Sequence, residues 1–350
     1  MTNAVAISQQ GSNNTTFRNR IINGAMVIDQ RNAGASGTAR LSYTVDRWGF
    51  FNSPASTYGT WGQNLNSVTP PVGFTNYLGY KTGASPYTIG ASEDVIFYQS
   101  IEGLNVADLA WGTANAKTVT LSFQVYSSLT GSFGGAIQNS AGNRSYPFSY
   151  TISSANTWTS ISITIQGDTT GTWLTTNGVG ITVIFALAAG SSVSGTANTW
   201  AAAGYASATG STSVLGTANA TFYITGVQLE AGSTASPFEY RSYGTELALC
   251  QRYYYQLMYD DSGKYNYFFR TYSSSGSLNT TGWPIWFPAT MRTDPTTTVK
   301  GTWTVSNCGQ PTVDMYTTKS VELNFLSTAS GVLTAYNNAT GVGVTFSAEL

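Results

Sequence analysis

The segment AKTVTLSFQVY, residues 116–126, alternates polar and apolar side chains from Thr118 to Val125. A β-strand points successive side chains to opposite faces, so this period of two sorts the residues onto two faces. One face is apolar and the other carries hydroxyls and an amide: Val119, Leu121, Phe123 and Val125 against Thr118, Thr120, Ser122 and Gln124. The pattern predicts a strand with one face in a hydrophobic core and the other face outside it.

Four further segments show related alternation, with apolar residues at intervals of two. They are residues 158–166 (Ile161, Ile163, Ile165), 179–187 (Ile181, Val183, Phe185, Leu187), 298–305 (Val299, Trp303, Val305) and 341–350 (Val342, Val344, Phe346). Glycine is frequent, at 37 residues, and 13% of the chain is aromatic, a mixture that favours pleated strands joined by tight turns. We therefore expect an all-β chain built from β-sandwiches.

The composition divides the chain into four segments. Residues 1–45 are polar and rich in Gly and Asn, so we expect an extended N-terminal anchor that docks on another surface. Residues 46–230 are expected to form the first sandwich, which a long loop of small residues at 189–220 interrupts. Residues 231–252 are expected to form a short connector, and residues 253–350 a smaller C-terminal β-sandwich.

One short helix is expected in YGTELALCQRYYYQL, residues 243–257. Thr245 is placed to cap its first turn. The helix would carry an apolar stripe formed by Leu247, Cys250, Tyr254 and Leu257. The residues from Tyr253 to Tyr255 are also suited to begin a strand, so both interpretations of that end remain open.

The composition excludes several classes of function. Lys and Arg total 15 and Asp and Glu total 16, with no basic block, so nucleic acid is not an expected partner. The chain has no histidine, which removes His-based catalytic triads and His-containing zinc sites. It shows no apolar run long enough for membrane insertion and no signal-peptide pattern. We predict no metal or cofactor, and we expect Cys250 and Cys308 to be two buried thiols.

Charged residues make up only 9% of the chain, and they gather before and after the first sandwich. Between Leu109 and Leu229 the one carboxylate is Asp168. If the first and last strands are neighbours, the two charged groups meet and form charge-assisted hydrogen bonds. We assign this predicted cluster, the docking collar, to Arg31, Asp46, Arg47, Glu230, Glu239 and Arg241. The alternative is solvated charge on ordinary loops, which contributes little to stability.

The two charged ends also carry recognisable motifs. NRIINGAMVIDQRNAG (19–34), YTVDRW (43–48) and ATFYITGVQLEAGSTASPFEYRSYGTELALCQRYY (220–254) together resemble a pattern common in tail-fibre and related virion proteins of bacteriophages, notably of marine and cyanobacterial phages. FPATMRTDPTTTV (287–299) is similar to a phrase found in many fibre tips.

The resemblance implies a jelly roll similar to carbohydrate-binding modules at 46–230 and a homotrimer in the virion, as a tail appendage. It also implies a receptor-binding role in host attachment. The N-terminal segment would contact another virion protein, which leaves the C-terminal β domain as the distal tip.

Sugars bind to aromatic faces that are flanked by amides and hydroxyls. The candidates in the C-terminal segment are Trp283, Trp286 and Tyr267, and those in the long loop are Trp200 and Tyr205. For each of them a position in the core or at a subunit interface is the alternative. The expected ligand is a host cell-surface polysaccharide or lipopolysaccharide.

Two other functions compete with glycan attachment. A head fibre or capsid decoration protein would stabilise the virion without contacting a receptor. A glycosidase would need paired carboxylates, for which the local candidates are Glu93 with Asp94, Glu102 with Asp108, and Asp260 with Asp261. Adjacent strand residues point to opposite faces, which makes the first and last pairs poor ones, and we expect no catalysis.

Overall fold

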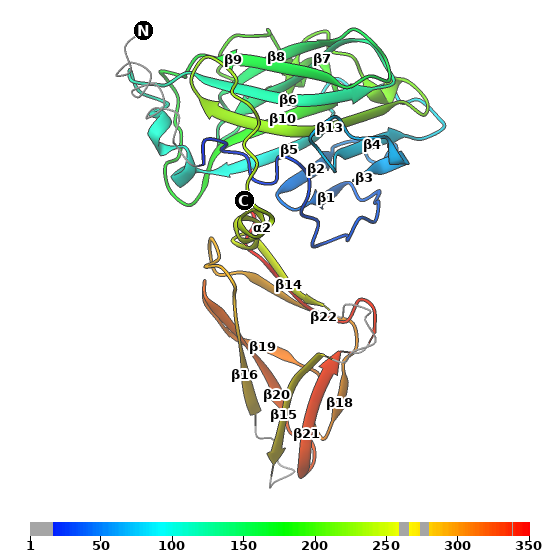
Figure 1. The fold of residues 1–350 in the computed structure, drawn as a ribbon, viewed down its shortest axis with the longest axis vertical. Helices are drawn as coiled ribbons and strands as arrows, with labels where there is room; N and C mark the ends of the chain where they lie inside the picture. Colours follow the sequence, from blue (N-terminus) through cyan, green and yellow to red (C-terminus); the bar gives the residue numbers. More distant parts are fainter. Residues whose placement is uncertain (1–16, 259–265, 274–279, 338) are drawn as a thin grey trace. The chain divides into compact units, whose positions relative to one another are not determined.

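A computed structural model describes residues 17–258, 266–273, 280–337 and 339–350 (Figure 1). The chain separates into two compact units, Met1–Arg241 and Ser242–Leu350. The boundary falls inside the segment that the sequence predicts to be a connector. Both units are built almost wholly of β-strands, as expected, and the described residues contain one α-helix.

The first unit is a sandwich of two sheets (Figure 1). The larger sheet has the strand order β1-β2-β5-β10-β7-β8, and all of its pairings are antiparallel. In chain order its strands are β1 (Leu41–Val45), β2 (Trp48–Asn52), β5 (Asp94–Glu102), β7 (Gly131–Gln138), β8 (Ser145–Ile152) and β10 (Val179–Ala189).

The smaller sheet of this unit has five strands in the order β3-β4-β13-β6-β9, again antiparallel. The last strand of the unit therefore lies between strands from its first half, as the predicted jelly roll requires. The strands are β3 (Gly59–Gln63), β4 (Leu78–Thr82), β6 (Val119–Ser127), β9 (Thr159–Ile165) and β13 (Thr221–Ala231).

The alternation in residues 116–126 forms β6, and its apolar face lies in the core as predicted. Leu121 and Val125 are fully buried. Phe123 packs edge-to-face on Phe185 of β10, with ring centroids 5.0 Å apart, so the two sheets meet through aromatic rings. Each fully buried side chain of this size contributes about 1.5–3 kcal/mol, which makes the sheet interface the main source of stability.

Residues 17–45, which the sequence assigned to an anchor, contribute to this core. Ile21 and Met26 are fully buried and belong to the same hydrophobic cluster as Phe123. The Asn19 side chain donates to the Val227 carbonyl and accepts from the Leu229 amide, so it joins the segment to β13. The segment looked too polar to fold alone because its apolar residues fall in two short runs among Asn, Gly and Arg, with no strand or helix period.

The outer face of the six-stranded sheet is apolar, and the long loop covers it. Ile96 and Ile184 on that face form a small cluster with Ala206 of the loop. The loop and the other connections contain short elements: η1 (Leu65–Ser67), η2 (Gly103–Asn105), η3 (Ala107–Leu109), η4 (Ser191–Val193), β11 (Ser194–Gly195), β12 (Ser207–Ala208) and η5 (Val214–Gly216). The run of small residues thus has a packing role, because it lets the loop lie close to the sheet.

The second unit begins with the one predicted helix, α2 (Tyr243–Gln251). Its N-cap is Ser242, so the prediction that Thr245 caps the helix was wrong; the two hydroxyls instead lie 2.8 Å apart. The helix ends before the tyrosines, and Tyr254 begins the strand β14 (Tyr254–Met258). The stripe predicted for residues 247–257 is therefore divided between a helix and a strand.

The described residues of the second unit also form three small antiparallel sheets. Their orders are β14-β22-β17, β15-β21-β18 and β16-β20-β19. The strands after β14 are β15 (Asn266–Ser273), β16 (Thr280–Trp286), β17 (Thr296–Lys300), β18 (Thr304–Ser306), β19 (Thr312–Tyr316), β20 (Ser320–Leu326), β21 (Gly331–Asn337) and β22 (Gly343–Ser347). Leu323, Leu333 and Val344, one from each sheet, are fully buried in a common core.

Both cysteines are buried thiols that form no disulfide, as expected. Cys250 lies on α2, and Cys308 packs into the core of the second unit. Within the described residues no helix has the length and apolar character needed to cross a membrane. The same residues contain no cluster of three or more metal-ligating side chains.

Asp46, just after β1, is fully buried beside the N-terminal segment. It accepts hydrogen bonds from the backbone and side-chain amides of Gln30, and the Arg31 guanidinium lies 3.4 Å from its carboxylate. Burial is the largest influence on this carboxyl group and raises its pKa from 3.8 to about 6, although Arg31 and Gln30 act in the opposite direction. The charged form is thus disfavoured in the folded state.

This raised pKa predicts a pH-dependent stability. Between about pH 4 and pH 6 the folded state binds more protons than the unfolded state at Asp46, so the free energy of unfolding falls as pH rises. The contribution is about 3 kcal/mol at most and is lost by about pH 6. We expect the difference in unfolding free energy between the wild type and Asp46→Asn, measured in urea from pH 3.5 to 7.5, to change within that window. A constant difference across the range would contradict the prediction.

Candidate functional site

The outer face of the five-stranded sheet carries hydroxyls and an amide where β6 and β9 run side by side. Ser122 lies directly opposite Ser162, and Gln124 lies opposite Ser160. These residues are the polar half of the alternation that buries Phe123, so their side chains point away from the core. The strand pattern itself therefore creates a polar surface at this place.

Only some of the polar side chains on this surface form hydrogen bonds within the protein. Gln124 Nε2 donates to Ser160 Oγ at 2.8 Å, and Ser160 Oγ donates back to Gln124 Oε1 at 3.0 Å. This reciprocal pair fixes the amide and leaves its second N–H and a carbonyl lone pair for another partner. The hydroxyls of Ser122 and Ser162 make no side-chain hydrogen bond within the described residues.

An aromatic wall stands along one side of this surface. Phe74 and Phe238 have ring centroids 5.1 Å apart, and Tyr240 packs on both, at 5.6 Å and 4.9 Å. The Tyr240 hydroxyl donates to the Gly73 carbonyl at 2.7 Å, which holds a side chain that is 60% exposed. Partial burial of this ring raises the pKa of Tyr240, so the hydroxyl remains a donor at neutral pH.

A glycine in β13 makes room for the wall. The pairing of β13 with β6 shifts register between Thr225 and Gln228, and Gly226 in this bulge has φ +62°. A Cβ at Gly226 would lie 2.6 Å from the Phe74 ring. Only glycine combines the left-handed backbone with this close approach, so the bulge seats the ring against the sheet.

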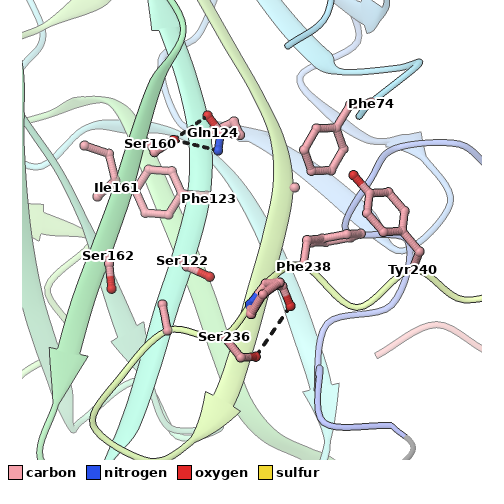
Figure 2. Close-up of a pocket in the computed structure, with 13 residues that line it drawn as sticks. Phe74, Ser122, Phe123, Gln124, Ser160, Ile161, Ser162, Ser236, Phe238 and Tyr240 are labelled. Atoms are coloured by element: carbon pink, nitrogen blue, oxygen red, sulfur yellow. Dashed lines mark hydrogen bonds between the residues drawn. The ribbon is translucent and has the colours of Figure 1, made fainter. Parts of the chain in front are cut away.

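The polar surface formed by Ser122, Gln124, Ser160 and Ser162, which we call the floor, meets the aromatic wall. Between them lies an open pocket of about 470 Å³, which we call the sheet-face pocket (Figure 2). None of its lining residues is charged: Phe74, Ser122, Phe123, Gln124, Ser160, Ile161, Ser162, Gly226, Ala235, Ser236, Pro237, Phe238 and Tyr240. In Figure 2 Gln124 and Ser160 lie on the floor, while Phe74, Phe238 and Tyr240 stand together beside it. An aromatic wall next to neutral hydrogen-bonding groups suits a polar ligand with an apolar face.

Two aromatic residues lie on the same sheet face beyond the pocket. Tyr126 of β6 and Trp158, just before β9, have ring centroids 5.5 Å apart and are half-buried. Trp158 Nε1 donates to the Thr69 carbonyl at 2.9 Å, which fixes the indole. The floor of the pocket therefore runs between two groups of aromatic rings.

The first and last segments of this unit meet, as the docking collar requires. Glu239 accepts hydrogen bonds from the backbone N–H groups of Phe17, Arg18 and Asn19, at 2.7, 3.2 and 2.8 Å. Arg241 lies 3.4 Å from Glu239 and also donates to the carbonyls of Asn19 and Ile21. Burial disfavours ionised Glu239, but these amides and Arg241 outweigh it and lower its pKa.

The other residues predicted for the collar lie in different surroundings. Arg31 and Asp46 form the second ion pair described above. Arg47 is buried and donates to the Ser100 carbonyl on β5. Glu230 is buried and accepts two hydrogen bonds from Ser236, both at 2.7 Å. The structure thus joins four of the six residues in two pairs and gives Arg47 and Glu230 partners outside the predicted set.

Trp200 and Tyr205, the two candidates in the long loop, are half-buried. Trp200 packs edge-to-face on Trp111 and Trp173, at 5.4 and 5.5 Å, and its Nε1 donates to the Gln166 carbonyl. The Tyr205 ring lies against Gly195. Neither residue lines the sheet-face pocket. The contacts of Trp200 hold the loop to the sandwich, while the Tyr205 ring packs within the loop.

The candidates in the second unit lie on two different strands. Trp286 is 70% exposed and Trp283 is 43% exposed, both on β16. Three positions separate them, so they point to opposite faces of the strand and form no single platform. Tyr267 belongs to β15, where its backbone pairs with Tyr336, but its side chain lies outside the described part of the chain.

Sequence reasoning missed the sheet-face pocket. The wall comes from Phe74 and from residues 237–240, which are far apart in the chain and show no shared motif. The floor did leave a signal, because the outward residues of β6 and β9 are hydroxyls and amides with no charge among them. Such a surface can form hydrogen bonds with a neutral polar ligand, which makes it worth testing.

Comparison with known proteins gives distant similarities only. No protein-family model and no curated protein matches the chain. Among solved structures, the enzymatically active domain of tailspike protein 4 of bacteriophage CBA120 has 10% identity and a TM-score of 0.33, covering 61% of this chain and 22% of that chain. The chain therefore spans about a fifth of the tailspike chain's length.

Two carbohydrate-binding modules give similar values. A module of family 4 has 16% identity and a TM-score of 0.30, covering 60% of this chain and 98% of its own. The family 11 module of Clostridium thermocellum, solved with a β-1,3-1,4-mixed-linked tetrasaccharide, has 12% identity and a TM-score of 0.28, covering 59% and 99%. Similarity at this level assigns no function to the chain.

The Glu239–Arg241 contacts generate a stability prediction. The Arg241 side chain is only 7% exposed and satisfies two backbone carbonyls as well as a carboxylate, so Arg241→Ala leaves buried partners unpaired. We expect the free energy of unfolding to fall by about 2–5 kcal/mol. Arg20→Ala is the control, because the Asp108 partner of Arg20 is 47% exposed and that ion pair is worth less than about 1 kcal/mol. Equal, small effects of both variants in urea unfolding would contradict a structural role for Arg241.

Proposed function

We propose that this protein binds glycans in the sheet-face pocket and does not cleave them. The observation that carries the proposal is the pairing of an uncharged hydroxyl and amide floor with an exposed aromatic wall. A sugar ring presents C–H groups on its faces and hydroxyls around its edge. Phe238 and Tyr240 suit the faces, while Gln124, Ser122 and Ser162 suit the hydroxyls.

The floor is suited to recognition because its groups are fixed before a ligand arrives. The reciprocal hydrogen bonds of Gln124 and Ser160 hold the amide in one orientation. The floor residues sit on strands rather than on loops, so binding orders little backbone and costs little entropy. The serine hydroxyls can rotate and act as donor or acceptor, which matches the mixed hydrogen-bonding character of sugar hydroxyls.

The absence of catalysis is part of the proposal. Hydrolysis of a glycosidic bond needs two carboxyl groups about 5–10 Å apart, and no carboxylate lines the pocket. Glu93 accepts hydrogen bonds from Tyr87 and the Gly90 amide, which gives it a role in a turn. Asp260 and Asp261 lie outside the described residues.

The resemblance of residues 19–48 and 220–254 to phage appendage proteins suggests where such binding acts. We propose that the protein is a tail fibre of a bacteriophage virion, attached to another virion protein through its N-terminal segment. It would recognise host surface polysaccharide or lipopolysaccharide. A capsid decoration protein remains the competing role, and immunogold labelling of intact virions separates the two, because a capsid-wide signal would exclude the tail assignment.

We also propose a homotrimer. The second unit exposes large apolar side chains on several strands, and such residues are favoured at subunit interfaces. They are Tyr272, Trp283, Trp286, Met315 and Tyr316. Analytical ultracentrifugation at micromolar concentration is expected to give three times the mass of the 37.2 kDa chain. A stable monomer at that concentration would overturn the assembly proposal without affecting the pocket.

The second unit offers a competing glycan surface at Trp286. The sequence favours this unit, because it is rich in Tyr and Trp, and the 70% exposure of Trp286 makes its ring accessible. Trp286 belongs to the second unit and does not line the sheet-face pocket, which lies in the first unit. Trp286→Ala therefore belongs in the same binding assay, and loss of binding in that variant alone would move the site to the second unit.

A matched pair of tyrosine variants tests the pocket. Tyr240→Ala removes an aromatic face from the wall, and we expect the glycan affinity to fall at least about tenfold, or about 1.4 kcal/mol. Tyr243→Ala is the control, because Tyr243 is similarly exposed, at 65%, and does not line the pocket. Glycans that bind the wild type on an array are titrated by calorimetry with each variant, and melting temperatures check folding.

Equal affinities in the two variants would show that the pocket does not bind the glycan. Gln124→Ala provides a second measurement, since it removes the fixed amide from the floor but no aromatic surface. We expect it to weaken binding in the same direction as Tyr240→Ala. A loss in Tyr240→Ala with no change in Gln124→Ala would show that the aromatic wall binds the glycan without help from the Gln124 amide.

A further inference from the structure

The residues that line the sheet-face pocket indicate which charge its ligand can carry. Its lining contains no Lys or Arg that could pair with an anion. Arg241, which follows Tyr240 closely in the chain, is directed toward Glu239 and the carbonyls of Asn19 and Ile21. An acidic group in the pocket would therefore lose water without gaining a cationic partner.

A buried carboxylate lies behind one end of the pocket. Glu230 is 5% exposed, and Ser236, a lining residue, donates to it through both its backbone N–H and its hydroxyl. Gln228 Nε2 also donates to Glu230, at 3.0 Å. All three donors are neutral, so the hydrogen-bond partners of the carboxylate do not cancel its charge. Ser236 joins this negative charge directly to the pocket lining.

From these two observations we infer that the pocket selects uncharged glycans and excludes acidic ones, meaning glycans with uronate, sialate, sulfate or phosphate groups. This inference rests on the proposed glycan-binding function and specifies its ligand class. A neutral sugar exchanges hydrogen bonds with water for hydrogen bonds with the floor. An acidic sugar adds the desolvation of a charge and repulsion from Glu230, and nothing in the lining offsets either cost.

The hydrogen bonds of Glu230 give it a specific role in this selection. The carboxylate does not line the pocket, and it acts through Ser236, whose hydroxyl it holds. Glu230 is therefore a positioning residue that also supplies a negative field. A purely structural residue would affect neutral and acidic glycans alike, whereas a charge that excludes anions changes only their ratio.

The first test compares glycans that differ only in charge. The full chain is applied to an array of neutral glycans and polysaccharides together with their sulfated, sialylated and uronic acid counterparts. We expect the bound members to be neutral, with acidic counterparts binding at least about tenfold more weakly. Binding that is equal or stronger for the acidic members would overturn the inference while leaving the glycan-binding proposal standing. No binding to any member would count against both.

Two substitutions test the cause of the selectivity. Glu230→Gln keeps a hydrogen-bonding group beside Ser236 but removes the charge, so we expect the neutral-to-acidic affinity ratio to fall while neutral binding changes less than about twofold. Ser162→Lys places a cation on the floor and is expected to create binding to acidic counterparts. Thr151→Lys, on an exposed position of β8, is its matched control. If the neutral-to-acidic affinity ratio is unchanged in both Glu230→Gln and Ser162→Lys, the electrostatic explanation is contradicted.

Discussion

The structure of the first unit depends on one constraint, which is that a strand buries every second side chain. In β6 this constraint drives Phe123 into the core against Phe185 of the opposite sheet. The same constraint turns Ser122 and Gln124 outward, to the face where the sheet-face pocket lies. Stability and the candidate site are therefore two consequences of one alternating pattern. The opposite sheet shows the contrast, because its outer face carries Ile96 and Ile184 and needs the long loop to cover it.

The strands were the most predictable part of the fold, because alternation is a local property that the sequence displays directly. The helix was found, but its cap was misplaced, since both Ser242 and Thr245 have the hydroxyl that caps require. The contribution of residues 17–45 to the core was not foreseen. Ile21 and Met26 show no periodicity, and the polar side chain of Asn19 does much of the joining.

The site was less predictable than the fold for a physical reason. A wall built from Phe74, Phe238 and Tyr240 exists only after β13 has brought distant segments together, and single aromatic residues give no hint of that. Trp200 attracted attention because it stands alone among small residues, yet that position reflects its packing on Trp111 and Trp173. The lack of charged residues on the floor was a better indication of the candidate site than any single aromatic residue. Asp168, the one carboxylate between Leu109 and Leu229, accepts hydrogen bonds from two nitrogens of the Arg144 guanidinium, so its charge is paired.

The bonds between Glu239 and the amides of Phe17, Arg18 and Asn19 have a mechanical consequence. They tie the beginning of the first unit to its end, immediately before the chain leaves at Arg241. A tensile force applied through the two ends of this unit meets these bonds, the Arg241 contacts and the Asn19 side chain before it reaches the sheets. Several bonds share the force at once, so the strands are not separated one at a time. We therefore expect this connection to break before the sheet that carries the pocket is deformed.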